Sequence, residues 1–526
     1  MSSWERSIRH VLVVAFLTSI TPHLNARPEP SASSAQNPGD QEARIHRIEA
    51  TVVQVPMGDT EPPVRLDLQK LMQLYKVPGL SVAVIDNFQI VWAKGYGVIE
   101  AGSAKPVTPL TLFQAGSISK PVAASGALYL VEHGKLSLDQ DVNQKLTTWK
   151  VPENEFTKNE KVTLRRLMSH SAGLTVHGFP GYDVNDPVPT LVQIFNGEKP
   201  ANTPPIRVDF VPGTRERSSG GGVTIEQQLM IDVTGKPFPD LMREITLDKI
   251  GMTDSSYEQP LPPSRAAMTA SGTRADARVV HGRWHIYPEM AAAGLWTTPT
   301  DLSKFAIEIA LSKHGKSNRV LSEAMTLEML TPVLDEAGLG FFLDKDNPGH
   351  FEHNGADEGF QAILTMNAES GHGLAIMANS DNGIAVGNFL LQSVAKEYGW
   401  NYKVTEHGPF PTLVLIAKLK GTQAALERYT ELKTSQSADH KVVESTLNEL
   451  GYTLLSSGQT QDAIAVFQRN VREYPKSANV YDSLGEAYMQ AGQKDLAIRN
   501  YEMSLKLNAG NQNAVDMLKK LLKQTK

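Results

Sequence analysis

Short runs of apolar residues that favour strands lie near both ends of the first 400 or so residues. Two such runs, Leu80–Asp86 and Gln89–Gly95, are joined by Asp86-Asn87, which is a hairpin signal. A second pair, Gln361–Asn367 and Gly373–Ala378, lies far along the chain. We therefore expect an α+β domain in which the two pairs meet in one antiparallel sheet.

The segments between these runs have helical patterns instead. A helix is predicted over Leu66–Lys76, where Pro78-Gly79 stops it, and another begins near Ile118 and ends at Gly134. Further helices are expected around Thr163–Ser169, Ile225–Val233, Thr300–Leu311 and Phe389–Tyr398.

Beyond Tyr398 the chain becomes rich in Ala, Leu, Lys and Glu and contains an internal repeat. Two glycines, an alanine and an aromatic residue recur at an offset of 34: Gly451, Gly458, Ala463 and Phe467, then Gly485, Gly492, Ala497 and Tyr501. This period and these small residues match the tetratricopeptide pattern. We expect two repeats and a capping helix over 443–526, preceded by a helical connector over 401–442 that also fits a degenerate repeat.

The first residues have the pattern of a secretory signal peptide. Arg6 and Arg9 precede the apolar run Val11–Ile20. Ala26 is a small residue after which a signal peptidase could cleave the chain. The run is too short to span a bilayer comfortably, and an uncleaved amphipathic start is the alternative. We expect a signal peptide over 1–26 and a periplasmic or secreted protein.

Length and composition set further bounds. A chain of 526 residues is long for one domain, so two or more are expected. Its net charge of −6 shows no excess of basic residues, which argues against a nucleic-acid partner. With no cysteine, disulfides, thiolate metal sites and a cysteine nucleophile are excluded. No later segment reaches transmembrane length, so no span is expected after signal removal.

The candidate chemistry begins at Ser117-Ile118-Ser119-Lys120. If a helix starts near Ile118, Ser117 is its N-cap and Lys120 lies one turn on, on the same side. The positive end of the helix would favour a serine alkoxide, and the Lys120 side chain could hold or take its proton. A second match, Ser393 with Lys396, lies within an ordinary amphipathic helix and offers no cap position.

Several stretches around this pair resemble the serine β-lactamase-related hydrolases, which include class C β-lactamases, D-alanyl-D-alanine carboxypeptidases, D-aminopeptidases and certain esterases. The resemblance covers roughly residues 60–400 and rests on 77–83, 111–117, 134–139, 167–174, 293–302 and 353–355. It implies a hydrolase domain over 56–400, with an antiparallel sheet flanked by helices and an all-helical lobe. Residues 27–55 are then a linker.

The resemblance also assigns roles. Ser117 would be the acylated nucleophile and Lys120 its proton partner. His353-Asn354-Gly355 fills the third motif of the family, on a strand at the edge of the cleft, where Gly355 lets the substrate backbone approach. The Ala356 and Ser117 N–H groups would form the oxyanion hole.

The second motif departs from the family pattern. Where relatives carry a tyrosine and an asparagine, or Tyr-Ser-Gly-Gly-Gly-Tyr, this chain has Ser218 in the tyrosine slot and Gly220 in the asparagine slot. A serine hydroxyl cannot replace a phenolate as a base. Three alternatives stay open: a neutral Lys120 is the base, Tyr182 or Tyr287 reaches in, or the site acylates slowly or not at all.

Two other patterns carry less weight. Gly220-Gly221-Gly222 lacks the Lys-Ser/Thr of a phosphate-binding loop. The spacing of His281, His285 and Glu289 could suggest metal ligation, but the aromatic residues between them favour a loop in the cleft wall. No metal and no cofactor are expected.

Two functions are compatible with these residues. The first is a serine hydrolase that forms an acyl-enzyme at Ser117 from an ester, an amide or a D-amino-acid peptide, with the repeats binding a protein partner. Its β-lactamase activity would be weak. The alternative is a catalytically silent scaffold protein whose cleft only binds ligands, which the change to Ser218 favours.

Overall fold

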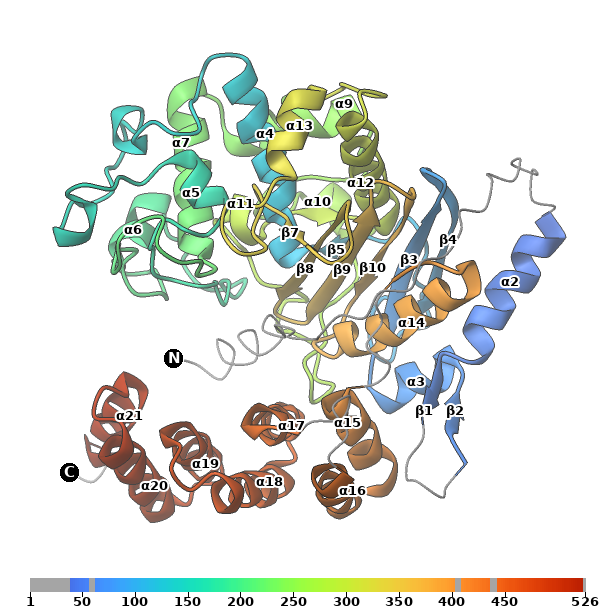
Figure 1. The fold of residues 1–526 in the computed structure, drawn as a ribbon, viewed down its shortest axis with the longest axis vertical. Helices are drawn as coiled ribbons and strands as arrows, with labels where there is room; N and C mark the ends of the chain where they lie inside the picture. Colours follow the sequence, from blue (N-terminus) through green and yellow to red (C-terminus); the bar gives the residue numbers. More distant parts are fainter. Residues whose placement is uncertain (1–37, 56–61, 403–407, 436–441, 524–526) are drawn as a thin grey trace. The chain divides into compact units, whose positions relative to one another are not determined.

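The computed structural model describes residues 38–55, 62–402, 408–435 and 442–523 (Figure 1). The described residues form two compact units: one is Tyr75–Asn388, and the other combines the described residues before Tyr75 with those from Phe389 onward. The predicted signal peptide, 1–26, lies outside the described residues. The unit boundaries lie inside the predicted domain limits of 56 and 400.

A six-stranded antiparallel sheet organises the Tyr75–Asn388 unit. Its order is β4-β3-β10-β9-β8-β7, with the strands β3 (Gly79–Asp86), β4 (Gln89–Gly97), β7 (Phe342–Leu343), β8 (His350–Asp357), β9 (Phe360–Asn367) and β10 (His372–Ala378). The central pairing aligns Ala375 of β10 with Ala83 of β3. The predicted union of the early and late strand pairs is therefore confirmed.

Helices pack on this sheet and form a lobe beside it (Figure 1). They are α4 (Ser119–Glu132), α5 (Leu164–Met168), α6 (Leu191–Asn196), α7 (Gly220–Thr234), α8 (Phe238–Met242), α9 (Asp248–Ile250), α10 (Pro263–Ala266), α11 (Met290–Ala293), α12 (Pro299–Lys313) and α13 (Glu323–Met329). Helix α12 packs on β3, β9 and β10, whereas α4, α5 and α11 all contact α7 in the lobe. The two-residue strands β5 (Phe113–Gln114) and β6 (Trp296–Thr297) pair just before α4 and α12.

The predicted linker over 27–55 is wrong where the structure describes it. Residues 38–55 form helix α2 (Pro38–Ala50) and strand β1 (Val53–Val55), which pairs with β2 (Val64–Leu66) ahead of α3 (Leu68–Leu74). The reason is burial, because Ile48, Val53 and Val55 are at most 1% exposed. The end of helix α14 (Gly383–Tyr398) lies against α2, since Arg47 pairs with Glu397 at 2.7 Å.

Antiparallel helix pairs fill the C-terminal region. They are α15 (Pro409–Lys420), α16 (Thr422–Ser435), α17 (Glu444–Ser456), α18 (Thr460–Glu473), α19 (Ala478–Gln490), α20 (Lys494–Leu507) and the final α21 (Gln512–Lys523). A Cβ on Gly451 would lie 2.4 Å from the Phe467 ring, and one on Gly485 would lie 3.1 Å from the Tyr501 ring. Both pairs thus pack closely at a glycine, at matching positions of the 34-residue period. Among the described helices, none is both long and apolar enough to cross a membrane.

Candidate active site

The nucleophile candidate lies in a tight turn ahead of α4. Ser117 belongs to a 3₁₀ turn, Gly116–Ile118, and α4 begins at Ser119 with Ile118 as its N-cap. The expectation that Ser117 itself is the N-cap is therefore wrong by one residue. The turn is fixed because the Ser119 hydroxyl donates to the Gly116 carbonyl at 2.6 Å. Ser117 still precedes the positive end of α4.

In the structure, the Lys120 side chain lies next to the candidate nucleophile, Ser117. Its Nζ lies 2.5 Å from the Ser117 Oγ and 3.0 Å from the Ala292 carbonyl at the end of α11. The side chain is only 6% exposed. Burial lowers the pKa of Lys120 to about 8, although the charge of Asp357 opposes this shift. At neutral pH Lys120 is thus mostly an ammonium ion, with a minor fraction of neutral amine that is able to accept the Ser117 proton.

Strand β8 lies directly against the turn Gly116–Ile118, which we call the nucleophile turn because it carries Ser117. A Cβ on Gly116 would lie 2.4 Å from the Ala356 nitrogen, and one on Gly355 would lie 1.9 Å from the Ala115 carbonyl oxygen and 3.1 Å from the Ser117 nitrogen. Because residue 355 is a glycine, the turn that carries Ser117 can pack closely against the strand. The sequence had instead predicted that this glycine makes room for the substrate backbone. The same packing places the Ser117 and Ala356 backbones side by side.

We expect Gly355→Ala to separate these two segments. The added methyl group has no space beside the Ala115 carbonyl, and overpacking of this kind destabilises a fold by about 1–3 kcal/mol. Thermal unfolding should show the loss, and labelling of Ser117 should slow. The matched control is Gly222→Ala, where no atom lies closer than 3.4 Å to the new Cβ. Equal melting temperatures for the two variants would contradict the prediction.

His353 is buried beside Lys120 as a neutral side chain. Its Nδ1 donates to the Asn354 carbonyl at 2.6 Å, so its Nε2 carries the lone pair. In the described structure, this Nε2 is buried without a hydrogen-bond partner. Burial, with a smaller effect from Lys120, lowers the pKa of His353 to about 3. His353 can therefore accept a hydrogen bond but supplies no positive charge to a substrate.

His170 joins this group, although the sequence marked it only as part of a family landmark. Burial lowers the pKa of His170 well below its ordinary value, and the charges of Lys120 and His353 contribute. The Ser219 N–H lies 3.3 Å from His170 Nδ1, which acts as the acceptor. The left-handed backbone of His170, with φ of 56°, is a feature that side-chain patterns do not reveal.

The second-motif residues support the start of α7. Ser219 is the N-cap of α7, and its Oγ also donates to the Thr175 carbonyl at 2.9 Å. Ser218 is half-buried, and its carbonyl accepts a hydrogen bond from the His177 ring at 3.2 Å. Gly220 is buried against the His177 carbonyl. Neither slot residue supplies a phenol or an amide.

The two tyrosine alternatives, Tyr182 and Tyr287, are disfavoured as bases. The Tyr287 hydroxyl accepts the Glu358 N–H at 3.0 Å, and the Tyr182 hydroxyl accepts the Asn202 N–H at 3.4 Å. Burial raises the pKa of both phenols above the ordinary value. A phenolate at either position is therefore disfavoured at neutral pH, which leaves Lys120 as the base that the geometry supports.

The possible metal-ligand pattern predicted from the sequence does not converge on one point. It consists of His281, His285 and Glu289. His281 Nδ1 lies 2.8 Å from an Asp183 oxygen, and His285 donates to the Pro180 carbonyl at 2.8 Å. Glu289 is fully buried ahead of α11, and burial raises its pKa to about 8. Among the described residues, no group of three or more His, Cys, Asp or Glu side chains could hold a metal.

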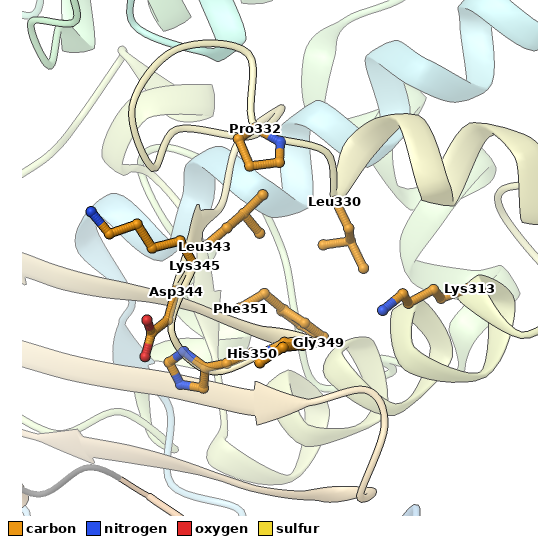
Figure 2. Close-up of a pocket in the computed structure, with 10 residues that line it drawn as sticks. Lys313, Leu330, Pro332, Leu343, Asp344, Lys345, Gly349, His350 and Phe351 are labelled. Carbon is orange, nitrogen blue, oxygen red and sulfur yellow. The ribbon is translucent and has the colours of Figure 1, made fainter. Parts of the chain in front are cut away.

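A hollow of about 200 Å³ lies at the other end of β8 (Figure 2). Its lining includes Leu330, Leu343, His350 and Phe351 but neither Ser117 nor Lys120. It is therefore separate from the candidate catalytic group, which lies at 353–357 on the same strand.

Acylation of Ser117 is expected to accelerate as pH rises from about 6 and to level off above about 8. Below its pKa of about 8, Lys120 is mostly an ammonium ion and cannot take the serine proton. His353, with its pKa of about 3, adds no step in this range. The labelling rate with a fluorophosphonate between pH 5 and pH 10 measures the profile. A rate that is flat or falls between pH 6 and pH 9 would exclude Lys120 as the base.

The chain is similar in sequence to known hydrolases. The chain is 30% identical over 214 residues to a beta-lactamase from Pseudomonas fluorescens, covering 41% of this chain and 55% of that protein. It is 23% identical over 359 residues to unguisins hydrolase ungD from Aspergillus violaceofuscus, covering 60% of each. The matches thus span only about 55–60% of the length of these two relatives.

Solved structures share the fold. The octameric penicillin-binding protein homologue from Pyrococcus abyssi aligns with a TM-score of 0.52 and 21% identity, covering 67% of this chain and 80% of that chain. A beta-lactamase/D-alanine carboxypeptidase from Yersinia pestis aligns with a TM-score of 0.50 and 20% identity, covering 63% and 96%. The Beta-lactamase family description matches residues 64–397, which include Ser117, Lys120 and strand β8. The chain therefore belongs to the beta-lactamase family.

Proposed function

We propose that this chain is an active serine hydrolase that forms a covalent acyl-enzyme at Ser117. The observation that carries the proposal is the contact of 2.5 Å between Lys120 Nζ and Ser117 Oγ, with burial lowering the lysine pKa to about 8. A nucleophile within hydrogen-bond distance of an amine whose lowered pKa leaves it partly neutral at mildly alkaline pH is the arrangement that nucleophilic catalysis needs.

The proposed acylation moves one proton. Ser117 Oγ attacks the carbonyl carbon of the substrate while its proton passes to the Lys120 amine. Two backbone N–H groups, of Ser117 and Ala356, would hold the oxyanion, and the nearness of their backbones supports this role. The Lys120 ammonium then returns the proton to the leaving oxygen or nitrogen as its bond to carbon breaks.

Esters with good leaving groups are the proposed best substrates, ahead of amides, D-amino-acid peptides and β-lactams. An activated leaving group needs little protonation, so the absence of a phenol at Ser218 affects it least. Deacylation by water depends more on a base, and for that reason we expect a long-lived acyl-enzyme with penicillins.

The C-terminal helices are proposed to be tetratricopeptide repeats that bind a protein partner. The 34-residue period supports this assignment, as does the repeated packing of Gly451 on Phe467 and of Gly485 on Tyr501. A periplasmic or secreted location is a further proposal, supported by the signal-like pattern of residues 1–26.

Intact-protein mass tests the proposal after separate incubation with a fluorescent penicillin and a fluorophosphonate. We expect a single adduct with each probe and none in Ser117→Ala. The decay of the penicillin adduct measures deacylation, and Ser218→Tyr, which returns a phenol to the second motif, should shorten its lifetime. No adduct with either probe in folded protein would contradict the hydrolase and support the alternative of a silent binding scaffold.

A further inference from the structure

Phe342, on the edge strand β7, takes no part in the acylation proposed above, yet its ring touches two residues of the candidate site. The ring centroid lies 5.4 Å from that of His353 and 6.2 Å from that of His170. We call these three rings the ring cluster. Both histidines are at most 5% exposed, whereas Phe342 is half-buried. Phe342 is therefore the member of the ring cluster that still presents surface.

The segment that carries Phe342 packs on the start of α4. A Cβ on Gly340 would lie 3.1 Å from the Pro121 Cα and 3.7 Å from the Lys120 carbonyl oxygen. The Gly340 N–H also donates to the Met168 carbonyl at the end of α5, at 3.2 Å. Phe342, two residues further on, thus belongs to a segment held against the helix that bears Lys120.

Strand β8 brings the ring cluster near the nucleophile. The ladder partner of Phe342 directly precedes His353 on β8. His353 is two strand positions, or about 7 Å, from Gly355. A Cβ on Gly355 would lie 3.1 Å from the Ser117 nitrogen. The ring cluster therefore borders the site of Ser117 and Lys120 on the side of β7.

The ring cluster offers apolar surface rather than an ionic partner. Burial lowers the pKa of both histidines, to about 3 for His353, so both rings are neutral at neutral pH. The nearby Lys120 Nζ is engaged with the Ser117 Oγ at 2.5 Å. A substrate group at Phe342 is thus bound by contact with a ring, and aromatic partners gain more from such a contact than their buried area alone provides.

We propose that Phe342 is a specificity-determining residue whose ring binds an aromatic ring of the substrate while Ser117 attacks the carbonyl carbon. The proposal rests on the hydrolase function above and narrows it to esters that carry an aromatic ring close to the reacting carbonyl. That ring belongs either to the acyl group or to the leaving group. The contact moves no proton, so it raises kcat/KM for ring-bearing substrates through binding.

The test compares three thioesters: the S-ethyl thioester of acetic acid, the S-ethyl thioester of phenylacetic acid, and the S-phenyl thioester of acetic acid. Because the chain has no cysteine, a thiol reagent reads only the released thiol. For each thioester, kcat/KM of the wild-type chain is divided by that of Phe342→Leu, so the intrinsic reactivity of the thioester cancels. We expect this quotient to be about tenfold larger for a ring-bearing thioester than for the ring-free one. The thioester that shows the difference identifies the acyl or the leaving-group side.

Two further variants serve as controls. Phe342→Tyr keeps an aromatic ring, so it should retain the wild-type preference, and its loss there would count against the proposal. Phe156→Leu makes the same exchange at another half-buried phenylalanine, on the 3₁₀ turn Glu155–Thr157. Its quotients should be equal for the three thioesters.

Equal quotients for the three thioesters in folded Phe342→Leu overturn the proposal, because a purely structural role would slow all three reactions alike. If that variant does not fold, Phe342→Met is judged by the same quotients. Failure of the hydrolase function looks different: the wild-type chain would then release no thiol in a Ser117-dependent manner and form no fluorophosphonate adduct.

Discussion

Ser117→Ala is expected to abolish acyl-enzyme formation while leaving the fold intact. Removing the nucleophile of a serine hydrolase lowers kcat by a factor on the order of 10⁴ or more. The substitution deletes one oxygen, whose hydrogen-bond partner in the structure is Lys120. Hydrolysis of an activated ester should therefore fall to the residual rate that the oxyanion hole and substrate binding alone support.

Two measurements check this expectation. Intact-protein mass should show no adduct from a fluorophosphonate, and thermal unfolding should resemble that of the wild-type chain. The control is Ser393→Ala, which alters the other Ser-x-x-Lys match, on α14, where the serine hydroxyl donates to the Ile48 carbonyl at 3.1 Å. Full adduct formation in Ser117→Ala would place the nucleophile elsewhere.

Lys120→Met is expected to have the second largest effect. Loss of a positioned proton acceptor commonly lowers rates by about 10²–10⁴-fold. Methionine matches the length of the buried stem, so the fold should tolerate it better than a truncation. The Ala292 carbonyl loses its hydrogen bond from Nζ, which we expect to produce only a modest loss of stability.

The pH dependence identifies what Lys120 does. In Lys120→Met, the residual labelling rate should no longer rise through pH 8, because the group that titrates there is gone. Stopped-flow or time-resolved mass measurements at pH 6, 8 and 10 give this comparison. A wild-type rise through pH 8 in the variant would assign the titration to another group.

Under the proposed hydrolase mechanism, we expect the departure in the second motif to change which step limits turnover. Acylation retains its own base in Lys120, whereas neither Ser218 nor the two nearby tyrosines offers a phenolate for deacylation. An enzyme with this site is expected to acylate faster than it deacylates with poorly activated substrates. Its practical substrates would then be those whose acyl-enzymes hydrolyse readily without a strong base.

Elements with a local pattern could be predicted from the amino-acid sequence. The short apolar runs Leu80–Asp86 and Gly373–Ala378 predicted strands that join in the centre of the sheet. The spacing of Ser117 and Lys120 placed both on one side of a turn, because residues three apart in a helical turn are neighbours. The family resemblance added His353 and its strand, and the 34-residue period identified the C-terminal helix pairs.

The electrostatics of the site, in contrast, depend on how the chain folds in three dimensions. The pKa of Lys120 depends on burial and on Asp357, a residue more than 200 positions away that β8 brings to the nucleophile turn. His170 joins the same group through a backbone conformation that its sequence context does not reveal. The linker prediction rested on the Pro- and Ser-rich stretch that ends at Asp40, whereas Ile48, Val53 and Val55 beyond it are buried. In each case the deciding contact joins segments far apart in the chain, and local periodicity carries no information about such contacts.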